Sequence, residues 1–138
     1  MLVCAACGKE ETDAPLPYVN VNVPFNINMP PYNIYLDLWP SAMKMPWERI
    51  GYNGNGLFLV RQAETHFQAY DATCTRNIAH HIVALTLEKF EYIAHCPHPG
   101  CGAQYNLLHG GYETGGQFRL QEYRVTYNPA TKQGSITN

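Results

Sequence analysis

Residues 18–28 read YVNVNVPFNIN and place an apolar side chain at every second position. This alternation is the period of a half-buried β-strand, whose successive side chains point to opposite faces of a sheet. Pro24 takes a polar position in the pattern, where its missing N–H is tolerated only at a sheet edge or a bulge. The stretch therefore predicts a strand with one buried face, at an edge or a bulge.

Further strand and turn signals follow along the chain. Residues 53–56 read NGNG, a turn signal because asparagine and glycine accept positive φ. Residues 34–39 fit a strand or one helical turn, and residues 40–50 indicate an irregular connector. Strands are expected at 57–61, 66–71, 82–87, 90–94, 118–127 and 135–137. Helix signals are nearly missing, so the sequence predicts the all-β class.

The composition limits the kind of protein. A chain of 138 residues can form one domain with a real core. With 46% apolar and 14% charged residues, it does not have the composition of a disordered chain. The net charge of −2 and the lack of a basic cluster predict no nucleic-acid partner. No run approaches the roughly 20 apolar residues that span a bilayer.

The first residues resemble the end of a bacterial lipoprotein signal. They read MLVCAAC, and cleavage before Cys7 would free this cysteine for lipid attachment. The acidic run that follows resembles the surface-export signal of Bacteroidetes lipoproteins. We therefore expect a signal remnant at 1–7, a tether at 8–17 and a β domain at 18–138, held by lipid at the outer membrane of the cell envelope. A cytosolic start with two incidental cysteines is the alternative.

Two cysteine-bearing loops lie between pairs of expected strands. The first, residues 69–77, reads AYDATCTRN, and the second, residues 95–106, reads HCPHPGCGAQYN. The Tyr-Asp step, the cysteine of each loop, the Gly-Ala-Gln-Tyr continuation and the later Gly-Gly pairs are similar to those of the Rieske-type [2Fe–2S] superfamily. The resemblance runs from residue 56 to the end of the chain. It implies an antiparallel β-sandwich with both loops at one tip, and a function in electron transfer.

The chain departs from the Rieske pattern at the ligands. A Rieske centre takes two cysteines and two histidines, supplied by Cys-x-His and Cys-x-x-His loops. In the first loop Arg76 stands in the place of the histidine, and a guanidinium has no lone pair to give a metal. In the second loop that place falls on Cys101 or on Pro99, depending on the alignment. We therefore expect a divergent member with degenerate ligands and without a standard cluster.

Three outcomes stay open for Cys74, Cys96 and Cys101. We favour a disulfide between two of them, which would pin the loops together in an oxidising compartment, with no cofactor. The alternative is a metal site in which His98 joins the three thiolates, a set that suits tetrahedral zinc or a non-standard [2Fe–2S] cluster. Buried, reduced and inert thiols are the third outcome.

The remaining titratable side chains nominate no catalytic residue. His80 and His81 precede the expected strand at 82–87 and alternate faces, so only one of them can point toward the first loop as a substitute ligand. The chain has no serine nucleophile elbow, phosphate-binding loop or His-Glu-x-x-His motif. The acidic residues are scattered and are expected on solvent faces: Glu64, Glu88, Glu91, Glu113 and Glu122.

These observations favour a structural or interaction module of the cell envelope over an enzyme, with the membrane and an envelope protein as partners. The alternative is an electron-transfer protein that keeps a cluster or a metal with altered ligands. A third hypothesis is a ligand-binding β domain that uses the tyrosines Tyr32, Tyr35 and Tyr52 as its surface.

Overall fold

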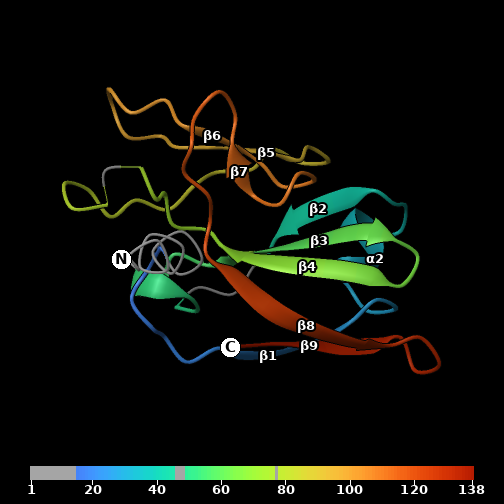
Figure 1. Ribbon diagram of the computed structural model, residues 1–138. Helices are drawn as coiled ribbons and strands as arrows, with labels where there is room; N and C mark the ends of the chain where they lie inside the picture. The colour runs from blue at the N-terminus through green and yellow to red at the C-terminus, as the bar shows by residue number, and fades with distance from the viewer. Residues whose placement is uncertain (1–14, 46–48, 77) are drawn as a thin grey trace, which may run out of the picture.

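The computed structural model describes residues 15–45, 49–76 and 78–138. These residues form short strands and two single helical turns, so the predicted all-β class is confirmed (Figure 1). In chain order the elements are β1 Asn22–Asn26, α2 Tyr32–Tyr35, β2 Ser41–Lys44, η1 Tyr52–Gly54, β3 Leu57–Ala63, β4 His66–Asp71, β5 Ile93–His95, β6 Gln104–Asn106, β7 Tyr112–Glu113, β8 Glu122–Asn128 and β9 Gln133–Thr137.

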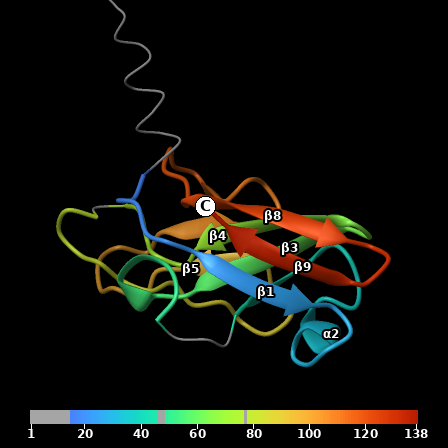
Figure 2. The same ribbon diagram turned by 90° about the horizontal axis from the view of Figure 1, so that it is seen from below.

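The strands form two antiparallel sheets. The larger has six strands in the order β1-β9-β8-β4-β3-β2, and the smaller has three in the order β5-β6-β7. Figure 2 shows β1, β9 and β8 side by side, while Figure 1 shows the smaller sheet lying over the β3–β4 part of the larger one. Pro24 pairs with Ser135 on the edge strand β1, so the prediction of an edge position is confirmed.

The β3–β4 hairpin has a hydrophobic core on each face. Leu57 and Leu59 belong to one cluster, with side chains from β1, α2 and β9, whereas Phe58 and Val60 belong to a second cluster under the smaller sheet. Successive side chains of a strand point to opposite faces, so a strand between two cores is apolar at every position. This explains the continuous run LFLV, and it places the second core directly beside the cysteine loops.

The structure differs from the sequence predictions in three segments. Residues 82–87 form only isolated bridges, because Ala84 pairs with Thr73 whereas Thr86 pairs with His95 and no ladder continues. The expected connector at 40–50 contains β2, which the sequence does not reveal because SAMK is weak in β-forming residues and pairs only with β3. The ambiguous segment around residue 34 resolves into the helical turn α2.

The N-terminal predictions fall largely outside the described residues. Cys7 and most of the 8–17 tether lie outside the described residues, so lipid attachment stays a prediction. Leu16 is already buried, and its N–H donates to Gln121 Oε1 at 3.4 Å. Within the described ranges, no helix has the length and apolar character needed to cross a bilayer.

Candidate metal centre

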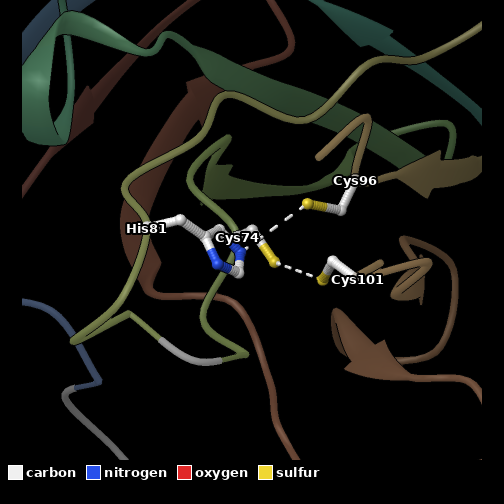
Figure 3. Close-up of side chains that lie close together, drawn as sticks. All are labelled: Cys74, His81, Cys96 and Cys101. Carbon is white, nitrogen blue, oxygen red and sulfur yellow. Dashed lines mark hydrogen bonds between the residues drawn. The ribbon is translucent and has the colours of Figure 1, made fainter. Parts of the chain in front are cut away.

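Four potential metal-ligating side chains meet where the two cysteine loops approach each other. Cys74 follows β4, Cys96 follows β5, Cys101 lies in the turn between β5 and β6, and His81 comes from the segment between the two loops. Their ligand atoms all lie within 4.8 Å of one another. Figure 3 shows the side chains pointing toward a common point. The predicted meeting of the two loops is therefore confirmed.

The loop that carries Cys74 is fixed by the end of β4. Asp71 is fully buried and accepts hydrogen bonds from the N–H groups of Tyr52 at 2.7 Å and Thr73 at 3.0 Å, and from the Tyr123 hydroxyl at 2.7 Å. These bonds satisfy the buried carboxylate and hold the chain just before the cysteine. Cys74 is consequently placed by rigid elements.

His81 reaches the group through a backbone pairing. Cys74 N–H donates to Val83 O at 3.0 Å, and Leu85 N–H donates to Ala72 O at 2.7 Å. Residues 81, 83 and 85 share one face of this extended segment. Since Leu85 is fully buried in the second core, the same alternation directs His81 inward toward the cysteines.

The second loop folds back sharply so that both of its cysteines face inward. Cys96 N–H donates to Ala103 O at 2.9 Å, and Cys101 N–H donates to His98 O at 3.0 Å, which closes the turn. The glycine that precedes Cys101 and the one that follows it have φ values of +83° and +67°, a region that side chains rarely adopt. The turn therefore brings the two sulfur atoms to the same side.

The spacing of the ligand atoms is compatible with a tetrahedron around one ion. Cys74 Sγ and Cys101 Sγ are 3.8 Å apart, and Cys96 Sγ lies 3.9 Å from His81 Nε2. Ligands at zinc bond lengths, with tetrahedral angles, lie about 3.5–3.8 Å from one another. The distance between the two sulfur atoms falls in this range, the sulfur–nitrogen distance is slightly longer, and the other four distances are at most 4.8 Å. The four residues lie close enough to bind a metal.

Burial makes two of the three thiols weaker acids than an ordinary cysteine. It raises the pKa of Cys74 above its ordinary value and raises the pKa of Cys96 to about 12. Burial also acts to raise the pKa of Cys101, but the Ala103 N–H, the neighbouring thiols and the positive charge of Arg76 outweigh it and leave that pKa below the ordinary value. Cys101 is therefore the most acidic of the three.

Tyr105, on β6, binds the backbone of the first cysteine loop. Its fully buried hydroxyl oxygen accepts the N–H groups of Thr75 and Arg76, both at 3.1 Å, and lies 3.4 Å from Cys74 Sγ. Because two N–H groups already donate to this oxygen, its own hydrogen is available to Cys74 Sγ or to Thr75 Oγ1. The phenol thus orients the backbone around Cys74 and contacts its sulfur directly.

Arg76, which stands where the Rieske pattern has a histidine, does not belong to the group of four. Its guanidinium donates to Cys101 O at 2.8 Å and forms an ion pair with Glu113 at 2.7 Å. The expectation that Glu113 lies on a solvent face is wrong, because its side chain is 1% exposed. The charge of Arg76 explains how a carboxylate can be buried there.

His98, the histidine expected in the metal set, is outside the group of four and stacks on His81 instead. The two rings are 4.3 Å apart and almost parallel, at 13°. Burial first, and then the neighbouring His98 and His80, lower the pKa of His81. The imidazole of His81 is therefore neutral at neutral pH, which is the form that binds a metal.

The disulfide favoured from the sequence is not formed in this structure. Cys74, Cys96 and Cys101 are free thiols, and the 3.8 Å between the sulfur atoms of Cys74 and Cys101 is far beyond the about 2.05 Å of a bond. The reason is geometric: the loops place the three sulfur atoms around a common point instead of pressing two of them together.

A signal for His81 is present in the sequence. In the segment from 81 to 87 the odd positions carry Val83, Leu85 and Leu87, whereas the even positions carry isoleucine, alanine and threonine. The odd positions therefore carry the larger apolar side chains, and Ile82, at an even position, is exposed. This asymmetry would have pointed His81 inward and His80 outward.

Comparisons with known proteins add no family to this description: the chain matches no protein-family model, no curated protein and no solved structure. The resemblance to Rieske domains therefore rests on the sequence motifs alone. Fold and site together define an all-β domain with a three-cysteine, one-histidine group at the junction of its two sheets.

Proposed function

We propose that this chain is a zinc-binding β domain in which one Zn²⁺, held by Cys74, His81, Cys96 and Cys101, joins the two loops and serves a structural purpose. The observation that carries the proposal is the mutual approach of all four ligand atoms to within 4.8 Å. Thiolates and a neutral imidazole form a ligand set that zinc prefers, whereas magnesium and calcium prefer oxygen ligands.

A single ion suits the spacing better than a two-iron cluster. In a Rieske centre the cysteines bind one iron and the histidines bind the other, so the ligand set is divided between two metal atoms. Here Cys96 Sγ approaches His81 Nε2, and every ligand atom is near every other. This supports a mononuclear centre and favours the structural module over the electron-transfer protein.

The ligand count supports a structural role. Structural zinc sites are closed by four protein ligands, whereas catalytic sites leave one position to water or substrate. Cys74, Cys96 and Cys101 are buried, and His81 supplies the fourth ligand. Since zinc is not redox-active, such a domain acts by holding its loops in shape for a binding partner and not by carrying electrons.

The test is metal analysis of the purified chain and its variants. We expect one zinc per chain and no stoichiometric iron, and we expect His81→Ala and each cysteine-to-serine variant to lose most of the zinc. His98→Ala is the matched control, since it removes the stacked imidazole and should leave the zinc content unchanged. Stoichiometric iron would support the electron-transfer alternative, and a chain without any metal would refute the proposal.

A further inference from the structure

The proposed zinc centre has a charge that the surrounding protein must balance. Three thiolates and one neutral imidazole around Zn²⁺ give a net charge of about −1. Cys74 is fully buried, and Cys96 and Cys101 are at most 9% exposed, so water screens this charge poorly. A buried charge is costly unless an opposite charge or hydrogen bonds compensate it. A cation beside the centre would therefore stabilise the bound metal.

Arg76 is a basic side chain that contacts a proposed ligand residue directly. Its Nη1 donates to the carbonyl oxygen of the ligand Cys101 at 2.8 Å. In the described part of the chain, Lys44 donates to the carbonyl oxygen of Leu85, in the core that holds the cysteines, but it contacts no ligand directly. Three other basic side chains bind partners away from the ligands: Arg61 contacts Leu36 and Glu64, Lys89 lies over the rings of Tyr35 and Phe90, and Arg119 contacts Tyr112 and Glu122. Arg76 thus places a positive charge directly beside a proposed ligand.

The position of Arg76 is set by Glu113 on β7. The buried carboxylate pairs with the guanidinium at 2.7 Å and accepts the Phe118 N–H at 3.4 Å. A Cβ atom at Gly116 would collide with the Glu113 side chain, so the turn after β7 closes tightly over it. Glu113 is consequently a fixed anchor that holds the guanidinium against the Cys101 carbonyl.

From this arrangement we propose that Arg76 is a positioning residue of the metal centre, whose positive charge is shared between Glu113 and the zinc–thiolate group and whose guanidinium fixes the turn that carries Cys101. This inference rests on the proposed zinc site. It assigns a purpose to the residue that occupies the histidine position of the Rieske pattern: the side chain binds no metal itself and acts on the centre through charge and through the Cys101 backbone.

The test compares zinc affinity among charge and hydrogen-bond variants, by competition with a chromophoric chelator at fixed neutral pH and ionic strength. Arg76→Gln keeps a hydrogen-bond donor and removes the charge, and we expect it to weaken zinc binding about 10–100-fold. Arg76→Lys keeps the charge and should lose less. Arg124→Met, which removes an exposed charge on β8, is the matched control and should bind zinc like the wild-type chain.

A double variant separates the counter-charge from a merely structural role. In Arg76→Gln/Glu113→Gln no buried carboxylate is left without its partner, so any harm caused only by that carboxylate disappears. We expect zinc affinity to stay as weak as in Arg76→Gln alone. If the wild-type chain loads zinc, two results would overturn the inference. One is wild-type zinc affinity in Arg76→Gln or in Arg76→Gln/Glu113→Gln. The other is equal zinc affinity in Arg76→Lys and Arg76→Gln. Absence of zinc from the wild-type chain would refute the proposed function itself.

Discussion

Cys96 has a thiol pKa raised to about 12 by burial, and burial also raises the pKa of Cys74. Both side chains therefore carry a proton at neutral pH when no metal is bound, whereas a thiolate is the form that binds zinc. The pKa of Cys101 is lower than its ordinary value, so this thiol loses its proton more readily than the other two, and neutral His81 contributes none. Zinc binding must displace these protons.

We accordingly predict that zinc binding near neutral pH releases about 2–3 protons per chain, and that the logarithm of the apparent affinity rises by about 2–3 per pH unit. The sign follows from the raised pKa values, because protons compete with the metal at every pH below them. Calorimetric titration in buffers of different ionisation enthalpy measures the number. Release of fewer than about one proton would mean that the thiols are already ionised.

At the residue scale, the sequence motifs predicted the cysteines, whereas for the histidine the sequence carries a signal that separates His81 from His80 but not from His98. The meeting of Cys74, Cys96 and Cys101 was implied by the resemblance of their two loops to those of Rieske domains. The choice between His81 and His98 depends on the Cys74–Val83 backbone bond, a pairing between segments that do not form a regular ladder. Local patterns carry no direct signal for such a contact.

The β8–β9 hairpin shows how one small residue sets the packing of an element. Gly134 pairs with Phe25 on β1 and with Tyr127 on β8. A Cβ atom there would collide with the Phe25 ring and with the backbone oxygen of Thr126. The Phe25 ring packs against the rings of Tyr127 and Phe67, with centroids 6.3 and 5.5 Å away. It therefore has little freedom to move aside.

Gly134→Ala should consequently lower the free energy of unfolding by about 1–3 kcal/mol, the range for overpacking a well-packed site. Denaturant unfolding of the metal-loaded chain measures this change. Ser135→Ala, at the next position of β9, is the control, because its hydroxyl pairs with Thr126 in an exposed position and the effect should stay within about 0.5 kcal/mol. A Gly134→Ala variant as stable as this control would show that β1 can shift to make room.

At the element scale, the sequence pattern from which a strand can be predicted depends on whether one or both of its faces are buried. The strand at 22–26, with one buried face, shows clear alternation, and β3, covered on both faces, shows a continuous apolar run. The short strands β5, β6 and β7 pair over two or three residues each, too few for a periodic pattern to appear. Their positions depend on the loops that the proposed metal would hold.

At the scale of the whole molecule, the two hydrophobic clusters lie on opposite faces of the β2, β3 and β4 part of the larger sheet, which contributes side chains to both. The first cluster gathers side chains of β1, α2, β8 and β9, and none of the four proposed ligands belongs to it. The second gathers Leu85, Ala94, Tyr105 and Leu107, and contains all three cysteines of the site. The stability of the second cluster should therefore depend on the metal far more than that of the first.

Removal of zinc by a chelator should then loosen one half of the domain and spare the other. We predict faster amide hydrogen exchange at Cys74, Leu85, Cys96 and Cys101, whose N–H groups hold the loops, while the amides of the β8–β9 hairpin stay protected. Exchange followed by mass spectrometry before and after chelation measures the pattern, and added zinc should restore it. If the metal supports only the second core, its removal cannot open the first. Equal loss of protection in both halves would therefore contradict the prediction and mean that the two cores unfold as one cooperative unit.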